Sequence, residues 1–285
     1  MPALSPGIGI NAHSMQIPSD ALVGIFSWVR VEFPLAFFDW AYTVETIDYY
    51  HDLGLEILFI VGQDWGDDAY GYARDIAQRC GSKITAFELY NEPQLDDTGS
   101  WPGMSASDYV NVCAGFARLF YRLPVFRYGG SVFNYHDSNA VGWMNDAKAA
   151  GLENYCDGIS WHHYADTVPE TIAVRLVELQ VMFPAKPIAC TETSWPKSFL
   201  TGSCGVGVWS ETVQGQFHVR QLAVRGAMPV CLYDGNHNSV QVDAGQALIN
   251  TLNNVSTDPH IRPSLQVIVD AIGTGQLVAV GPQPG

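Results

Sequence analysis

Eight short apolar runs, spaced evenly along the chain, are the feature that most constrains the fold. They lie at 7–11, 28–32, 57–61, 86–90, 125–129, 158–161, 187–191 and 230–233, and start about 32 residues apart. Longer amphipathic stretches separate or follow them, at 39–53, 68–80, 107–121, 138–150, 169–182, 212–225 and 264–271. This alternation predicts a parallel sheet, because each helix carries the chain back to the start of the next strand.

The number of runs selects a closed barrel over an open sheet. Eight strands with no ninth predict a (β/α)8 TIM barrel of the α/β class, and 285 residues are close to the usual size of about 250 residues. No linker-like stretch divides the chain, so we expect a single domain over residues 1–280 and a flexible tail at 281–285. A dinucleotide-binding sheet is not favoured, because residues 8–13 lack a GxGxxG motif.

Composition narrows the partners that such a barrel can have. The net charge is −15, and the sequence holds no cluster of lysine and arginine. Nucleic acid is therefore not an expected partner, because phosphate contacts need clustered positive charge. No apolar run approaches the ~18 residues of a membrane-spanning helix, so we expect no membrane partner and a soluble monomer or weak homo-oligomer.

The first residues and the cysteines do not indicate one cellular compartment for the protein. No signal peptide is visible at the start of the sequence, which agrees with a cytoplasmic protein, a secreted protein that has lost its signal, or a virion component. The six cysteines include no metal-like CxxC pair.

Polar and aromatic residues gather where the predicted strands end. In a barrel of this kind, the carboxyl ends of the strands face the active site. The residues that we expect to line this site are Asn11, His13, Arg30, Asp64, Asn91, Glu92, His162, Tyr164, Glu192, Trp195 and Tyr233. The amino-terminal ends of the strands carry no such series. The alternative interpretation is ordinary loop polarity.

Two carboxylates, Glu92 and Glu192, end the fourth and seventh runs. Across an eight-stranded barrel these ends are three strands apart, so the carboxylates can approach within several ångströms. Hydrolysis of a glycosidic bond needs such a pair, one to protonate the leaving oxygen and one to attack or to direct water. A separation of about 5–5.5 Å predicts retention of anomeric configuration, and ~6.5–9.5 Å predicts inversion. The alternative is two salt bridges at loop edges.

Asn91 and Glu92 are consecutive, although strict strand alternation turns only one of them inward. A bulge at the strand end, helped by Pro93, would turn both toward the site. Glu88 shares its parity with Tyr90 and Glu92, so we expect it to point into the barrel below the site. A buried charge there needs a partner.

Arg30 is the candidate partner of Glu88. It lies in an apolar strand that charged residues interrupt. Beside a nucleophilic carboxylate, an arginine keeps that group ionised by lowering its pKa. A structural ion pair with Glu32 or Glu88 is the other interpretation, and the two roles can coexist. A catalytic role for Glu88 itself is a weaker hypothesis.

His162, His163 and Tyr164 end the sixth run. Adjacent histidines on a strand point to opposite faces, so at most one enters the cleft, and Tyr164 shares a face with His162. A metal site is not favoured, because the HxH or HxxxH spacing with a carboxylate is absent. Trp195 is suited to the apolar face of a sugar ring, or to packing.

Several of these segments together resemble clan A of the glycoside hydrolases, the retaining (β/α)8 enzymes that include families 5 and 39. Residues 87–93, Phe-Glu-Leu-Tyr-Asn-Glu-Pro, are similar to the clan's fourth-strand Asn-Glu-Pro signature, in a form that is typical of family 39. Residues 188–195 resemble its seventh-strand motif, and residues 9–11 and 29–31 its first two strands. His162 and Tyr164 match a sixth-strand His-x-Tyr pattern. The resemblance spans about residues 7–236.

The resemblance implies a retaining glycoside hydrolase that cleaves O-glycosidic bonds of a poly- or oligosaccharide by double displacement, without a cofactor. The acid/base falls on Glu92, the nucleophile on Glu192 and a sugar-binding amide on Asn91. Tyr164 is expected to hydrogen-bond the nucleophile.

One departure from the clan concerns the substrate. Many relatives end the eighth strand in a tryptophan that floors the cleavage subsite, whereas this chain has Tyr233 and Asp234 there. Two alternatives stay open: a catalytically silent carbohydrate-binding barrel, and a metal-dependent barrel hydrolase that uses His162, His163, Asp64 or His237.

Overall fold

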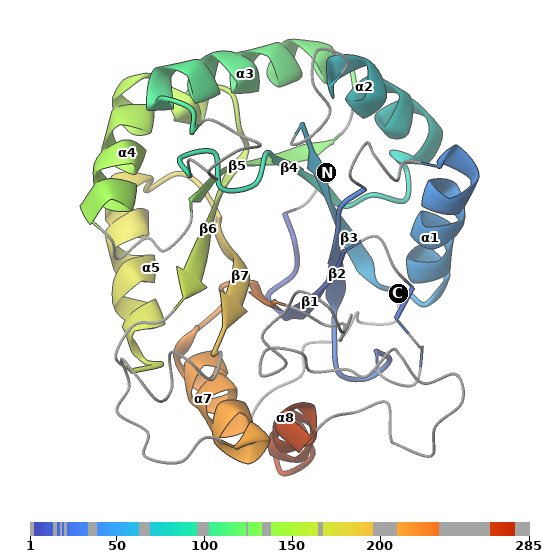
Figure 1. The fold of residues 1–285 in the computed structure, drawn as a ribbon, viewed down its shortest axis with the longest axis vertical. Coiled ribbons are helices and arrows are strands. Elements are labelled where there is room, and N and C mark those ends of the chain that lie inside the picture. Colours follow the sequence, from blue (N-terminus) through green and yellow to red (C-terminus); the bar gives the residue numbers. More distant parts are fainter. Residues whose placement is uncertain are drawn as a thin grey trace.

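The chain forms a closed barrel of parallel strands in a computed structural model (Figure 1). The structure describes residues 3–13, 16–17, 19, 22–33, 39–62, 69–95, 103–123, 125–132, 138–164, 168–195, 210–233 and 263–276. Eight strands follow one another around the barrel in chain order: β1 (Ile8–His13), β2 (Trp28–Val31), β3 (Glu56–Val61), β4 (Ala86–Leu89), β5 (Phe126–Val132), β6 (Gly158–Tyr164), β7 (Ile188–Ser194) and β8 (Val230–Leu232). β1 pairs with β8, which closes the barrel.

Helices surround the strands as an outer ring (Figure 1). They are α1 (Trp40–Asp52), α2 (Ala69–Cys80), α3 (Ala106–Leu119), α4 (Ser138–Ala149), the short 3-10 helix η4 (Leu152–Asn154), α5 (Thr171–Met182), α7 (Glu211–Val224) and α8 (Pro263–Gly273). The prediction of a single-domain (β/α)8 TIM barrel is therefore confirmed. The limits of the domain at 1–280 stay a prediction, and the tail at 281–285 lies outside the described residues.

Four strands run further toward their carboxyl ends than the apolar runs predict, and β1 is one of them, since it ends at His13 and its run at 11. β5, β6 and β7 end at Val132, Tyr164 and Ser194, whereas the runs end at 129, 161 and 191. The added residues continue the ladder between β6 and β7, in which Tyr164 is the register partner of Ser194. The runs stop early because polar side chains that enter the barrel resemble loop residues in a sequence.

The lower half of the barrel interior is filled by an apolar plug. Its buried side chains come from the amino-terminal halves of the strands and from the segment before β1: Leu4, Trp28, Leu58, Ala86, Tyr128, Ala189 and Cys231. Gly9 makes room for the Trp28 indole, since a Cβ on Gly9 would lie 2.4 Å from that ring. The plug separates the site above it from the amino-terminal opening of the barrel. A second, larger apolar core lies between the strands and the helices.

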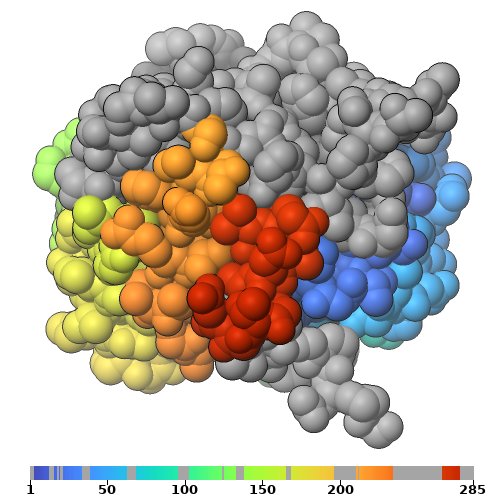
Figure 2. Space-filling model, turned by 90° about the horizontal axis from the view of Figure 1, so that it is seen from below, coloured from blue at the N-terminus to red at the C-terminus, as the bar shows by residue number. Residues whose placement is uncertain are grey.

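α7 and α8 lie side by side on one flank of the molecule, as the orange and red surfaces of Figure 2 show. The inner face of α7 is buried but polar, with Gln214, His218 and Gln221 each at most 1 % exposed. Gln221 donates a 2.8 Å hydrogen bond to Oγ1 of Thr193, which fixes α7 against the outer face of β7. Among the described residues, no helix has the length and apolar character that crossing a bilayer requires.

Candidate active site

A polar layer lies directly above the apolar plug, toward the carboxyl ends of the strands. Trp28 in the plug is followed by Arg30 on β2, Ala86 by Glu88 on β4, and Ala189 by Thr191 on β7. We define the polar layer as Arg30, Glu88, Asn91, Glu92, Ser131, His162, Tyr164, Thr191 and Glu192. Hydrogen bonds join six of these residues around Arg30, and they join the other three, Ser131, His162 and Glu92, around His162. A 3.5 Å contact between His162 Nδ1 and Glu192 Oε2 links the two sets into one network.

Asn91 and Glu92 both enter this layer, as the sequence predicts. The strand ends at Leu89, and Tyr90 and Glu92 take left-handed backbone conformations with φ of 69° and 45°. Nonglycine residues adopt this region rarely and at a cost of about 1–3 kcal/mol. Two left-handed residues, rather than the predicted bulge, therefore turn consecutive side chains inward.

Tyr90 does not share the inward orientation of Glu88, so that part of the prediction is wrong. Its ring packs against the outer core, edge-on to Tyr109 at 6.5 Å between centroids. A Cβ on Gly62 would lie 2.4 Å from the Tyr90 ring, so glycine is needed there. The positive φ at Tyr90 reverses the alternation that the expected parity assumed.

β7 carries a bulge where the side chains of Thr191 and Glu192 enter the barrel. Trp161 pairs with Cys190 and His162 with Glu192, so Thr191 is an extra residue on β7. Thr191 Oγ1 donates to Glu88 at 2.6 Å, while Glu192 accepts from Arg30 and Tyr164. The bulge thus turns two consecutive side chains into the barrel.

A similar irregularity on β5 places Ser131, a residue that the sequence analysis missed. Ser131 has φ of 46° and is the extra residue where the β5–β6 register shifts. Its Oγ lies 3.2 Å from Nε2 of His162. The preceding Gly129-Gly130 pair is the signal that a bulge occurs here, because glycine inside a strand often marks one.

Arg30 is fully buried and binds three residues through three nitrogens. Nε donates to Glu88 Oε2 at 2.6 Å, Nη2 donates to Asn91 Oδ1 at 2.7 Å, and Nη1 donates to Glu192 Oε1. Arg30 therefore forms the ion pair with Glu88 that one interpretation predicted, and it also contacts the seventh-strand carboxylate. Its action on a nucleophile stays a prediction. The predicted partner for the buried charge of Glu88 is confirmed.

The two buried carboxyls differ in how their surroundings affect ionisation. Burial raises the pKa of Glu192 above its ordinary value, and nearby Glu92 adds to the rise, while His162, Arg30 and the Tyr164 hydroxyl limit it. Burial opposes ionisation of Glu88 as well, but Arg30, His162 and the Thr191 hydroxyl hold the pKa of Glu88 below its ordinary value. Glu88 is therefore ionised at neutral pH.

Tyr164 shares a face with His162, as predicted, and donates its hydroxyl to Glu192 Oε2. Burial, together with the negative charges of Glu192 and Glu92, raises the pKa of Tyr164 well above its ordinary value. The phenol consequently stays protonated and remains a hydrogen-bond donor to the carboxylate. Tyr233 lies edge-on to Tyr164, with 5.9 Å between ring centroids.

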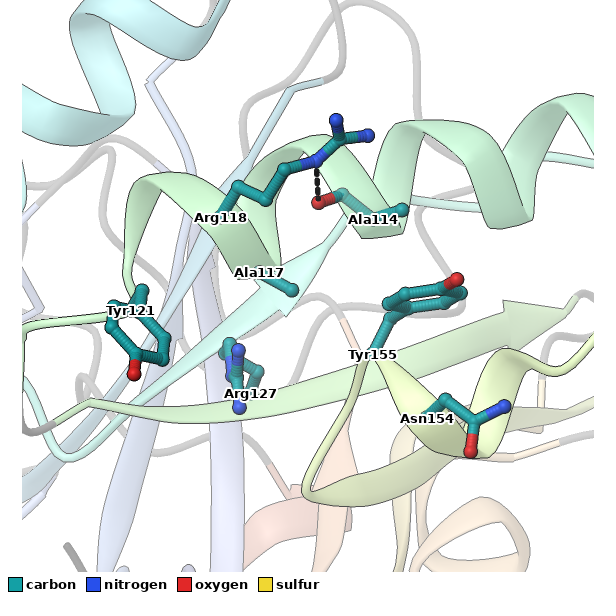
Figure 3. A pocket seen from close by; sticks show the side chains of 7 residues that line it. All are labelled: Ala114, Ala117, Arg118, Tyr121, Arg127, Asn154 and Tyr155. Atoms are coloured by element: carbon teal, nitrogen blue, oxygen red, sulfur yellow. Dashed lines mark hydrogen bonds between the residues drawn. The ribbon is translucent and has the colours of Figure 1, made fainter.

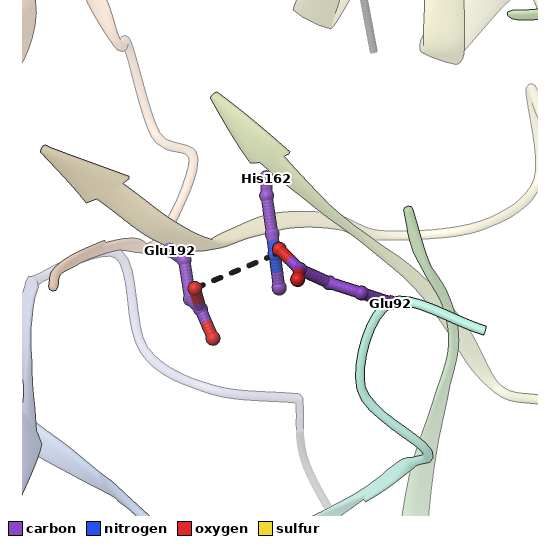
Figure 4. Close-up of side chains that lie close together, drawn as sticks. All are labelled: Glu92, His162 and Glu192. Carbon is purple, nitrogen blue, oxygen red and sulfur yellow. Dashed lines mark hydrogen bonds and ion pairs between the residues drawn. The ribbon is translucent and has the colours of Figure 1, made fainter. Parts of the chain in front are cut away.

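His162 lies between the two site glutamates (Figure 4). Its Nδ1 is 2.7 Å from Oε1 of Glu92 and 3.5 Å from Oε2 of Glu192. Burial lowers the pKa of His162 to about 4, so the imidazole is neutral at neutral pH. A neutral imidazole has one donor and one acceptor nitrogen, which suits a contact with Glu92 on one side and Ser131 on the other.

The carboxylates of Glu92 and Glu192 are close together. One oxygen from each and a ring nitrogen of His162 all lie within 4.8 Å of one another. This is also the one group of metal-ligating side chains found among the described residues. The spacing argument missed it, because its ligands come from three different strands. The Arg30 guanidinium beside Glu192 opposes the binding of a cation there.

The remaining predicted residues divide into three groups. Asn11 is buried on β1 as the register partner of Arg30, next to the polar layer. Trp195 is fully buried outside the barrel, where its Nε1 donates to Gln221 and its ring contacts Phe217, so it packs the fold and does not face the polar layer. Outside the described residues lie the His13 side chain, Asp64, Asp234 and His237.

His163 is on the opposite face of β6 from His162, as predicted. Its Nε2 lies 3.2 Å from Thr171 Oγ1, and Gln221 Nε2 lies 2.8 Å from its Nδ1. It cannot join His162 around a common metal ion.

A separate hollow of about 640 Å³ lies outside the barrel, near the start of β5 (Figure 3). Its lining is Ala114, Ala117, Arg118, Tyr121, Arg127, Asn154 and Tyr155. Asp157 accepts from Arg127 through both oxygens, at 2.8 and 2.9 Å. This hollow contains no residue of the polar layer.

No protein-family model and no curated protein matches the sequence. The structure is similar to that of an endo-β-1,6-glucanase, BT3312, with a TM-score of 0.66, 13 % identity and coverage of 95 % of this chain and 77 % of the other. It is similar to a GH128 (subgroup II) endo-β-1,3-glucanase from Pseudomonas viridiflava, with a TM-score of 0.65, 17 % identity and coverage of 93 % and 97 %.

A GH39 β-xylosidase from Caulobacter crescentus matches with a TM-score of 0.63, 15 % identity and coverage of 93 % of this chain and 71 % of that one. At these identities the matches establish a shared fold. The class of fold is thus the (β/α)8 barrel seen in clan A glycoside hydrolases, as the sequence resemblance led us to expect.

Proposed function

We propose that the protein is a retaining glycoside hydrolase that cleaves O-glycosidic bonds of a poly- or oligosaccharide with two glutamates. The observation that carries this proposal is the approach of Glu92 and Glu192 oxygens to within 4.8 Å. Retaining enzymes hold their two carboxyls about 5–5.5 Å apart, whereas inverting enzymes need ~6.5–9.5 Å to admit a water molecule between carboxyl and sugar.

Different surroundings support different roles for the two carboxyls. The Glu192 side chain is 4 % exposed and is oriented by Arg30 and Tyr164, which suits a nucleophile that must attack from one direction. The Glu92 side chain is 19 % exposed, and His162 Nδ1 lies 2.7 Å from its Oε1. The greater exposure of Glu92 suits an acid/base that must exchange a proton with the leaving oxygen and with water.

In the first step, Glu192 forms a bond to the anomeric carbon while the bond from that carbon to the leaving oxygen breaks. Glu92 gives its proton to the leaving oxygen, so the negative charge passes from Glu192 to Glu92. The product of this step is a covalent glycosyl-enzyme.

In the second step, Glu92 takes a proton from water, and the oxygen of that water attacks the anomeric carbon. The ester bond to Glu192 breaks, and the sugar leaves with its original configuration. Asn91, fixed by Arg30, is the amide beside the reacting carbon. These steps need no cofactor.

The first substrates to test are neutral β-linked glycans. Three of the similar solved structures are an endo-β-1,6-glucanase, an endo-β-1,3-glucanase and a β-xylosidase. A panel of β-1,6-glucan, β-1,3-glucan and β-xylo-oligosaccharides, with product analysis by NMR, identifies the sugar and the stereochemical outcome.

Alanine variants of the two glutamates test the assignment. Glu192→Ala should lose activity at least about 10⁴-fold, because the nucleophile is absent, and added azide should restore turnover. Glu92→Ala should lose least on aryl glycosides whose leaving groups need no proton. The matched control is Glu153→Gln, an exposed glutamate on η4, which should leave activity unchanged. Wild-type turnover by either alanine variant would refute the proposal.

The group formed by Glu92, His162 and Glu192 supports one competing function, a metal-dependent hydrolase. Treatment with EDTA separates the two candidates. Full activity after metal removal supports the two-glutamate mechanism, whereas loss of activity that Zn²⁺ or Mn²⁺ restores supports the metal-dependent one.

A further inference from the structure

Glu88 is a third buried carboxylate in the polar layer, and neither step of the proposed mechanism uses it. Its side chain is 0 % exposed. Oε2 accepts from Arg30 at 2.6 Å, and Oε1 accepts from the Thr191 hydroxyl at 2.6 Å. Thr191 immediately precedes Glu192 on the bulge of β7. Glu88 therefore contacts the arginine that orients the nucleophile and also the residue before the nucleophile.

Arg30 forms ion pairs with two carboxylates at once before the reaction begins. The Arg30 side chain is 1 % exposed, and its guanidinium contacts the side chains of Glu88 and Glu192, which are 0 % and 4 % exposed. One positive charge and two negative charges thus share a space from which water is excluded. The nucleophile alone would be enough to neutralise Arg30, so Glu88 adds a negative charge that the resting state does not need.

The covalent step changes this balance. When Glu192 becomes an ester, its charge falls from −1 to 0, and the charge appears on Glu92, which has released its proton. Glu92 contacts His162, whereas Arg30 reaches only the neighbouring Asn91 through Nη2. Without Glu88, the esterified state would contain a buried guanidinium with no carboxylate bonded to it. An uncompensated buried charge is strongly destabilising.

We propose that Glu88 is the counter-ion that remains with Arg30 while the nucleophile is esterified, and that it thereby stabilises the glycosyl-enzyme and the transition state before it. This inference rests on the proposed double displacement. Glu88 acts through Arg30 and does not reach the reacting atoms, so it is a positioning residue. Thr191 supports it by holding the second oxygen of the carboxylate.

The probe is 2,4-dinitrophenyl 2-deoxy-2-fluoro-β-D-glucoside, together with the corresponding xyloside. Attack by Glu192 expels dinitrophenolate, which needs no proton from Glu92, so labelling reports the charge change at Glu192 alone. The labelling rate is followed by intact-protein mass spectrometry, and peptide mapping identifies the labelled residue.

Glu88→Gln should slow labelling about 100-fold, since the substitution leaves Arg30 without a counter-ion in the product. Thr191→Val removes a hydrogen bond but keeps the charge, and should slow labelling by no more than about tenfold. Glu88→Asp also keeps the charge and should label faster than Glu88→Gln. Equal labelling rates for wild type and Glu88→Gln would overturn the inference.

A double-variant comparison separates charge compensation from a merely structural role. In an Arg30→Gln background there is no cation to neutralise, so adding Glu88→Gln should cost less than about tenfold. A further loss of about 100-fold in that background would overturn the inference. The comparison of Arg30→Gln with the double variant still decides the question if Glu88→Gln alone does not fold, because removing one charge of each sign leaves the net charge of the polar layer unchanged.

Failure of the underlying mechanism gives a different result from failure of this inference. If wild-type protein hydrolyses glycosides but is never labelled on Glu192, double displacement is wrong and the role of Glu88 falls with it. If wild type is labelled on Glu192 and Glu88→Gln is labelled equally fast, the mechanism stands and only the counter-ion role is wrong.

Discussion

The apolar plug and the polar layer lie only two positions apart along a strand, yet different interactions stabilise the two regions. On β2 the plug residue Trp28 precedes Arg30, and on β4 Ala86 precedes Glu88. Side chains of the plug gain stability separately, by burial and shape. Members of the polar layer are stable only as a set, because each buried charge depends on the others. Substitutions in the two regions should therefore separate stability from activity.

Arg30→Gln should have the largest combined effect on stability and activity, because it breaks the polar layer at its centre. Glu88 and Glu192 would then lie buried beside each other without a cation, which should lower the free energy of unfolding by about 3–5 kcal/mol. Glu192, the proposed nucleophile, would also lose its orienting donor, so activity should fall at least about 10³-fold. Urea unfolding and turnover of folded protein measure the two losses. A stable, active variant would contradict the dependence of the layer on Arg30.

Trp28→Ala tests the plug two residues away. Removing a fully buried indole should lower the free energy of unfolding by about 3–5 kcal/mol, through lost burial and the cavity left behind. Turnover per folded molecule should change by less than about tenfold, because the indole makes no hydrogen bond to the polar layer in the described contacts. A large loss of turnover in fully folded protein would show that the plug also positions the site.

Tyr164→Phe tests the electrostatics of the polar layer with little change in packing. The proposed mechanism needs Glu192 ionised, so activity should fall as pH drops through the pKa of Glu192, which burial raises above its ordinary value. The Tyr164 hydroxyl lowers the pKa of Glu192. Removing this hydroxyl should therefore raise the pKa of Glu192 and move the acid limb of kcat/KM to higher pH. Tyr233→Phe is the matched control. An acid limb that does not move would rule out this role of the phenol.

Arg127→Gln should have the smallest effect, at the hollow outside the barrel. Its pair with Asp157 is partly exposed, with side chains 20 % and 35 % accessible. Such a pair is worth about 0–1 kcal/mol, which water and salt screen further. Thermal unfolding should change by no more than a few degrees, and kcat/KM should be unchanged. A loss of activity would connect this distant surface to the site.

Residues of the polar layer could be placed from the sequence where a simple repeat sets their position. Glu92 and Glu192 were expected at the carboxyl ends of the fourth and seventh strands, and both lie there. His162 and Tyr164 were expected on one face of β6, and both contact a site glutamate. A strand alternates its faces by geometry, so local order is enough for such predictions.

The prediction was weakest where the backbone departs from that repeat. Tyr90 was expected inside the barrel and lies outside it, because its φ is positive. Ser131 and Thr191 were not proposed as site residues, although both contact the network after bulges on β5 and β7. Trp195 was expected to bind substrate, and it packs against α7 because the alternation after the bulge turns it outward.

The sequence by itself determined the number and order of the strands, the closed barrel, and the end of it that carries the polar side chains. Periodic hydrophobicity is local information, and eight equal repeats have one economical closure. Only the tertiary structure decided which charges meet. Arg30, Glu88 and Glu192 are far apart in the chain, and their contact depends on strand register, a bulge and left-handed turns that neighbouring strands stabilise. Those features are set by long-range packing, which no local pattern contains.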